Sequence, residues 1–296
     1  MTHDELVSGA EPPGTIARPP QRRLSGLIAS RAPVIALAYL LAVLLAASFA
    51  PLLTGSDPGY LDPGSRLQPM SVAHPLGTDA LGRDLYARIL YGGRVSLAVG
   101  FGVTVVSVAF GLLAGVLAGY FRACDRVIMQ MMDGLMAIPS ILLAIALVAL
   151  WGGGLGTVIL AISVPELPRV VRLVRSAILK ARAELYVEAA ISLGARPWRL
   201  LMRHLVPNTI APLLIQGTFV FSSAMLTEAA MSFLGIGLPS EIPSWGNIMA
   251  EGRKLFQLKP GLILFAGFVL AGTILSLNLL GDAARDALDP KLASDR

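Results

Sequence analysis

The sequence predicts an all-α, polytopic membrane protein with six transmembrane helices. Apolar residues make up 55% of the 296 residues and charged residues only 15%, a balance typical of membrane proteins. Several runs without charge are also long enough to cross the bilayer, which takes about 20 residues of helix. The third observation is a polar segment at 178–208 that interrupts these runs.

The expected spans follow the charge-free runs in chain order. No charged residue occurs within 32–56, 95–121 or 260–281, and each of these runs predicts one span. The longer run at 134–165 contains a glycine cluster around Gly153, which predicts a turn between two spans. The six spans are expected near 32–53, 94–120, 127–150, 155–175, 209–236 and 260–281.

The distribution of Lys and Arg predicts the orientation of the chain. With the N-terminus in the cytoplasm, the cytoplasmic segments hold 17 of the 24 basic residues, as the positive-inside rule requires. These segments are 1–31, 121–126, 169–208 and 282–296. Six acidic residues nearly balance the seven basic residues on the other side. We therefore expect both termini to be cytoplasmic, and the net charge of +5 reflects topology and not a nucleic-acid partner.

The chain is expected to divide into four parts. Residues 1–31 are rich in proline and predict a disordered cytoplasmic tail. Residues 32–93 comprise the first span and an extracytoplasmic loop. Residues 94–282 form a core of five spans, and residues 283–296 form a cytoplasmic C-terminal tail.

The polar segment at 178–208 predicts two short helices joined at a glycine. Apolar residues recur at helical spacing from 178 to 193. Gly194 suits a left-handed position at a helix end, and Pro197 suits the first turn of a second helix. The two helices would form a knob outside the bilayer. The residues leave open a second interpretation, an amphipathic loop that lies on anionic lipid and is anchored by Trp198.

Several stretches of the chain resemble one family of transport proteins. Glu188-Ala189-Ala190, with Gly194 and Pro207 beyond, resembles the EAA loop of bacterial ABC-importer permeases. Other stretches resemble the peptide/nickel class of these permeases, of the dipeptide/oligopeptide permease C type. They are HPLGTDALGRD at 74–84 with YGGRVSL at 91–97, SFLGIG at 232–237 with PSWGN at 243–247, and NLLGD at 278–282 with RDALDP at 285–290.

The resemblance implies the fold of a type I ABC importer permease, in which the EAA loop is a coupling helix that docks onto a cytoplasmic ATPase. The residues expected to couple to the ATPase are Glu188, Ala189, Ala190, Leu193, Gly194, Trp198, Arg199 and Pro207. The implied partners are a homologous second permease, two nucleotide-binding ATPase domains, an extracytoplasmic substrate-binding protein and the lipid bilayer of a bacterial plasma membrane. ATP and magnesium would be bound by the ATPase subunits, and this chain would hold no cofactor.

The chain departs from the family pattern in the fourth predicted span. These permeases often have Trp-Pro where this sequence has Leu167-Pro168, and Pro165 and Glu166 lie just upstream. The lining of the pathway at this point therefore cannot be carried over from the family.

Three acidic residues within the predicted spans are candidates for the translocation path or its gate. They are Asp133, Glu166 and Glu228. A charge in the middle of the bilayer costs at least about 2.5–3.5 kcal/mol and is therefore a functional candidate by default. An ion pair between Glu166 and Arg169 is the structural alternative, and Asp133 lies near enough to one surface to reach the headgroups. For Glu228 we favour a structural role at the gate end.

Glycines in the second span predict close helix packing. Gly111, Gly115 and Gly119 repeat a small-xxx-small spacing, which we interpret as packing within the subunit, with a subunit interface as the alternative. No metal site is expected, because His74 has no second ligand at suitable spacing. The sequence also contains no G-x-x-x-x-G-K-[ST] phosphate loop, so this chain is not expected to bind ATP in that way.

Together these features predict the permease subunit of an ATP-driven, binding-protein-dependent importer, without enzymatic activity of its own. It would form half of the translocation pathway. Closely similar permeases handle dipeptides, oligopeptides, glutathione or nickel chelates, and we expect di- or oligopeptides here. The alternatives from other classes are a self-sufficient carrier that uses Asp133, Glu166 and Glu228 as ion sites, and a membrane scaffold that transports nothing.

Overall fold

The computed structural model describes residues 23–288 and confirms the all-α prediction, since that part of the chain contains no strand. The predicted tails fall largely outside the described residues, at 1–22 and 289–296. The helices are α1 (Arg23–Ser48), α2 (Ala50–Leu53), α3 (Leu85–Tyr120), α4 (Arg122–Met136), α5 (Ser140–Trp151), α6 (Leu155–Arg182), α7 (Leu185–Ser192), α8 (Pro197–Leu200), α9 (Pro207–Phe233), α10 (Trp245–Arg253) and α11 (Gly261–Leu288). Pro63–Ser65 form a 3₁₀ turn, η1, and Leu201–Leu205 form a π-helical turn, η2.

Four of the described helices are long and apolar enough to cross a membrane: α1, α3, α9 and α11. The pair formed by α4 and α5 would make a fifth span if it is counted as one. The predicted number of six spans is therefore not confirmed. The predicted fourth span, α6, is not among these helices, because its second half carries five basic residues.

The third predicted span, over 127–150, is not one continuous helix. The chain forms α4 and α5 there, and their axes are bent by 91°. Pro139 lies at the break and is the N-cap of α5. Proline has no N–H to donate to the preceding turn and disfavours the helical conformation in the residue before it. This proline is the reason for the bend.

Two other predicted boundaries also differ from the structure. The extracytoplasmic loop was expected to reach residue 93, but α3 begins at Leu85 because the Asp84 side chain caps it, accepting a hydrogen bond from the Ala87 N–H at 2.8 Å. The helix expected over 178–193 is interrupted, because α6 continues to Arg182 and α7 begins only at Leu185.

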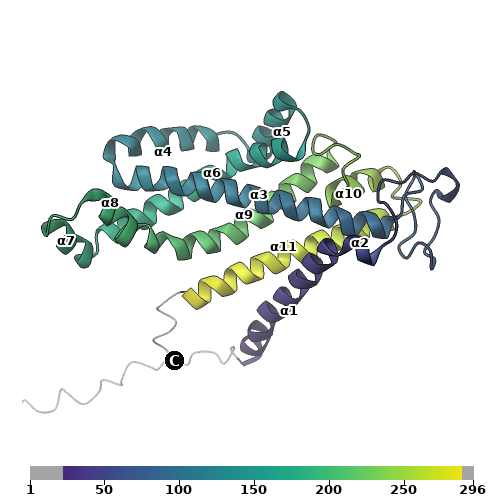
Figure 1. Cartoon of the computed structure of the whole chain (residues 1–296), viewed down its shortest axis with the longest axis horizontal. Helices are drawn as coiled ribbons and strands as arrows, with labels where there is room; N and C mark the ends of the chain where they lie inside the picture. Colours follow the sequence, from purple (N-terminus) through teal and green to yellow (C-terminus); the bar gives the residue numbers. More distant parts are fainter. Residues whose placement is uncertain (1–22, 289–296) are drawn as a thin grey trace, which may run out of the picture.

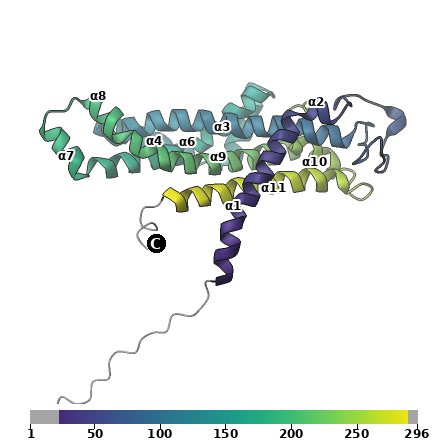
Figure 2. The ribbon, with the colours of Figure 1, turned by 60° about the horizontal axis from the view of Figure 1, so that its bottom comes forward.

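The long helices run along the length of the molecule, and different short helices and loops lie at its two ends (Figure 1). At one end lie α7 and α8, and at the other lie α10 and the 54–84 connection. We call these the α7 end and the α10 end. Helix α1 contacts α11 and crosses it at a steep angle (Figure 2). Helices α4 and α9 lie on either side of α6 (Figure 1).

The closest packing of the bundle is between α3 and α6. Gly111, Gly115 and Gly119 lie against Val170, Val174 and Ile178 of the same chain. A Cβ atom at Gly115 would lie 2.5 Å from the Cβ of Val174, which is far inside normal contact distance. These glycines thus let the two backbones approach closely within the subunit.

Candidate functional site

The first candidate site is the surface at the α7 end that we call the α7–α8 knob, residues 185–205. Its inner side is apolar and buried. The anchoring side chains are Val187, Leu200, Leu201 and Leu205, which belong to the same core cluster as α3, α6 and α9. The knob is therefore a fixed part of the bundle and not a loose loop.

The outer side of the knob is also apolar, but it is exposed. Leu193 is 89% exposed and Trp198 is 69% exposed. They line a surface hollow of about 770 Å³ together with Ala190, Gly194 and Arg199. Exposed apolar side chains around a hollow, rimmed by basic residues, are typical of a surface that another protein covers.

Backbone chemistry sets the shape of the knob at Gly194. Its φ is +77°, the left-handed conformation that the sequence predicted. The Gly194 N–H donates to the Ile191 carbonyl at 2.9 Å, and the Ala195 N–H donates to the Ala190 carbonyl at 3.0 Å. This pair of bonds is a Schellman motif that ends α7. A Cβ atom at Gly194 would meet nothing within 4 Å, so only backbone conformation restricts this position.

The rest of the EAA segment lies around this turn. Glu188 and Ala189 are exposed on α7, and Glu188 makes no ion pair within residues 23–288. Pro207 is the first residue of α9, and Val206 alone separates it from η2. Because Pro207 cannot donate to the preceding turn, the chain forms a π turn there, in which the Val206 N–H donates to the Leu201 carbonyl at 2.8 Å.

A second candidate site is a row of ion pairs along α6. Arg175 donates to both carboxylate oxygens of Asp125 on α4, at 2.5 and 2.7 Å. One turn away, Arg172 donates to Asp133 at 2.6 Å, and both of these side chains are exposed. Asp133 therefore lies on the surface of the bundle, paired with a basic residue of the neighbouring helix.

The third pair in the row is within α6 itself. Arg169 Nη1 lies 3.2 Å from both carboxylate oxygens of Glu166. Ser223 of α9 donates to the same carboxylate at 2.8 Å. Glu166 is buried, whereas the Arg169 side chain is 53% exposed. The ion pair between Glu166 and Arg169, which the sequence offered as the structural alternative, is present, and Arg169 is its exposed member.

Glu228, the remaining acidic candidate, is completely buried and lies at the α10 end. Its Oε1 accepts hydrogen bonds from the hydroxyls of Ser232 and Ser244, each at 2.9 Å. Ser244 is also the N-cap of α10 and accepts the Asn247 N–H. Glu228 thus joins α9 to the first turn of α10. Its side chain lies in the interior of this chain.

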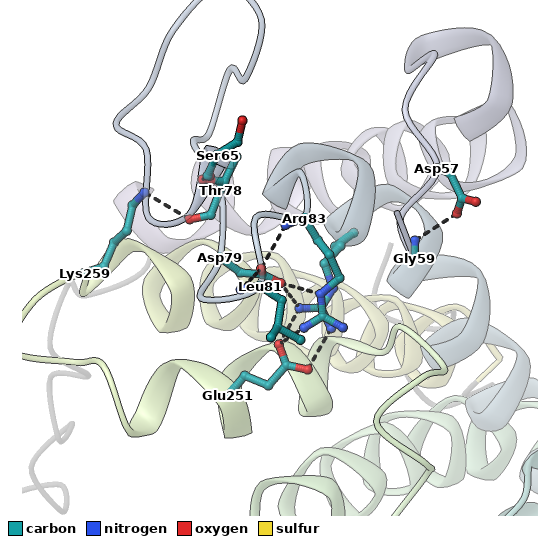
Figure 3. A network of polar contacts seen from close by, with 10 residues as sticks. Asp57, Gly59, Ser65, Thr78, Asp79, Leu81, Arg83, Glu251 and Lys259 are labelled. Carbon is teal, nitrogen blue, oxygen red and sulfur yellow. Dashed lines mark hydrogen bonds and ion pairs between the residues drawn. The ribbon is translucent and has the colours of Figure 1, made fainter. Parts of the chain in front are cut away.

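Sequence reasoning missed a polar network that fixes the α10 end (Figure 3). Arg83 Nε donates to Asp79 at 2.7 Å, and Arg83 Nη2 donates to Glu251 of α10 at 2.6 Å. The buried Arg88 of α3 also contacts both acids. The near balance of charge outside the spans was the only signal of this pairing, since the partners lie far apart in the sequence.

Lys259 forms a second connection between the 54–84 segment and the bundle at the α10 end. Its Nζ donates to the carbonyl oxygens of Thr78, at 3.0 Å, and of Gln68. Partial burial lowers the pKa of Lys259, and the nearby Asp79 carboxylate opposes this shift. Together with the Arg83 and Arg88 pairs, this contact fastens the 54–84 connection to the bundle. Within residues 23–288, no cluster of side chains could hold a metal ion.

The sequence matches a known family over most of its bundle. Residues 107–294 match the family described as binding-protein-dependent transport system inner membrane component. A probable peptide ABC transporter permease of Sinorhizobium fredii is 51% identical, over 89% of this chain and 91% of the relative. A dipeptide transport system permease of Alkalihalophilus pseudofirmus is 39% identical, over 99% of this chain and 97% of the relative.

Two further comparisons extend this relationship. A glutathione transport system permease of Pectobacterium atrosepticum is 41% identical, over 76% of this chain and 75% of the relative. The fold is also similar to that of a chain in inward-facing structures of the MetNI methionine ABC transporter. There the TM-score is 0.58 at 19% identity, over 68% of this chain and 97% of the other. The chain belongs to the family of binding-protein-dependent transport system inner membrane components and is a permease subunit of an ABC importer.

Proposed function

We propose that this chain forms half of the translocation pathway of a peptide importer, and that an ATPase drives it through the α7–α8 knob. One observation carries this proposal. The knob presents Leu193 and Trp198 to solvent while its inner side is fixed in the core. An apolar surface on a rigid base can transmit the movement of a bound partner to the helices behind it.

The proposed partners supply what this chain lacks. Two nucleotide-binding ATPase domains would bind ATP and magnesium, because the sequence has no phosphate-loop motif. A homologous permease would provide the other half of the pathway, and an extracytoplasmic binding protein would deliver the substrate. The chain itself would perform no catalysis.

The proposed orientation places the knob and both termini in the cytoplasm. It rests on the 17 of 24 basic residues assigned to that side. The α10 end, with its network around Glu251, then faces the binding protein. ATP binding would draw the ATPase domains together, and the knob would move α6 and α9 with it, so that one two-state element couples the two sites.

The proposed substrates are di- or oligopeptides. Two of the relatives are named for peptide or dipeptide transport and one for glutathione, which is itself a small peptide. Their sequences resemble this chain over three quarters of its length or more. A peptide is therefore the substrate class that these relatives share.

The coupling proposal is tested by placing a charge on the knob. Leu193→Glu and Trp198→Glu change exposed side chains, so the fold should persist while the ATPase no longer binds an apolar surface. We expect the ATPase to be lost when the chain is purified in mild detergent, and ATP-driven uptake to stop in liposomes. Leu258→Glu, at a site 77% exposed near the α10 end, is the control and should retain the ATPase.

Normal recovery of the ATPase with both knob variants would contradict the coupling role. Uptake that survives ATP depletion but collapses with an uncoupler of ion gradients would instead support a self-sufficient carrier.

A further inference from the structure

The exposed face of α6 is polar along half of the helix. Arg169, Arg172 and Ser176 are exposed and follow one another at helical spacing. The opposite face carries Val170 and Val174, which are buried against α3. The polar face therefore points away from α3, and Arg172 on it reaches Asp133 of α4.

This face begins about halfway along α6. Arg169 is 14 residues from the start of α6 at Leu155, which is about 21 Å along the helix axis. The Arg169 side chain is 53% exposed, and Arg169 is among the basic residues assigned to the cytoplasmic side, so it is too costly to leave in hydrocarbon. The face must border water or another protein, and it explains why α6 lacks the composition of an ordinary span.

Arg169 is held in place but keeps free hydrogen-bond donors. Within residues 23–288, its only hydrogen bonds are those of Nη1 to Glu166, and Ser223 fixes that carboxylate from α9. A guanidinium has five N–H donors in a planar fork. The remaining donors of Arg169 are thus available to a ligand on the exposed side, at a fixed position.

We propose that Arg169 binds the carboxylate of a peptide substrate as it passes along the polar face of α6, and that Glu166 is its positioning residue. The inference rests on the proposed peptide substrate. A guanidinium fork matches a carboxylate, and every unmodified peptide carries one at its C-terminus. Because Glu166 already neutralises Arg169, the carboxylate is held weakly enough to leave, as a pathway requires.

The test compares two peptides that differ only at the carboxylate. Purified wild-type and Arg169→Gln permeases are each reconstituted with the partner permease, the ATPase subunits and the binding protein. Uptake of radiolabelled alanine tripeptide and of its C-terminal amide is measured with ATP present. Dividing each variant rate by the wild-type rate for the same peptide cancels the selectivity of the binding protein.

For Arg169→Gln we expect this ratio to fall about tenfold for the free acid, as for the loss of one charge-assisted hydrogen bond, and to stay near one for the amide. Arg169→Lys keeps the charge without the fork and should give an intermediate fall. Lys254→Gln removes an exposed positive charge from the α10 end and should change neither ratio.

Two outcomes overturn the inference in distinguishable ways. If the Arg169→Gln ratios fall equally for both peptides, or fall for neither, the carboxylate site is wrong and peptide transport stands. If the wild-type importer moves neither peptide, the proposed substrate class is wrong and the carboxylate site falls with it.

Discussion

At the scale of single residues, Glu228 shows how an acidic side chain in a long apolar helix acquires a structural task. Its Oε1 is the acceptor for the hydroxyls of Ser232 and Ser244. Glu228→Gln keeps an acceptor oxygen in the same place, so we expect the melting temperature in detergent to change little. Glu228→Ala removes the acceptor from two buried donors and leaves a cavity, which should cost about 2–4 kcal/mol of unfolding free energy. Equal losses in the two variants would show that hydrogen bonding is not what Glu228 provides.

At the scale of elements, the α3–α6 contact depends on the absence of side chains. Gly115→Ala would place a Cβ 2.5 Å from that of Val174, so we expect the helices to separate at a cost of about 1–3 kcal/mol. Gly156→Ala is the matched control in α6, because its Cβ would meet nothing within 4 Å. It should stabilise the helix by up to about 1 kcal/mol. Thermal unfolding of both variants, and of Gly115→Ala with Val174→Ala, measures the coupling directly. Additive effects in the double variant would contradict a steric contact.

At the scale of the whole molecule, buried and exposed ion pairs should contribute differently to the unfolding free energy. Arg88 is only 1% exposed and joins α3 to Asp79 and Glu251. Arg88→Met removes the buried cation and leaves these two acids to Arg83 alone. The loss of charged hydrogen bonds should cost about 1.5–3 kcal/mol of unfolding free energy. Arg172→Met breaks the exposed pair with Asp133 and should cost at most about 1 kcal/mol. Chemical denaturation of both variants checks the contrast, and similar losses would show that the exposed pair is also structural.

Local chemistry allowed parts of this structure to be predicted from the sequence. The left-handed turn at Gly194 and the helix start at Pro197 depend on backbone preferences of single residues, and both occur in the structure. The ion pair of Glu166 and Arg169, three residues apart on one helix, was also predictable as an alternative and is present.

Other features depend on contacts that a linear pattern does not contain. The hydropathy pattern counts charge-free length, so it joined α4 and α5 into one span although Pro139 separates them. It also treated α6 as an ordinary span, because the exposure of Arg169 is decided by where α3, α4 and α9 pack. The pairs that Arg88 forms with Glu251 join residues 163 positions apart.

The nearly continuous run from α8 through η2 into α9 has a mechanical consequence. Helix α9 has 27 residues and is therefore a rod about 40 Å long, with the knob at one end and the seat of α10 at the other. A rod of this kind fixes the angular phase of its two ends. One added residue within it would rotate Glu228 by about 100° about the helix axis relative to the knob, so that its side chain would no longer face Ser244 of the α10 N-terminus. The length of α9 is therefore constrained as well as its composition, and the π turn at η2 is a place in the run where the regular helical spacing already changes.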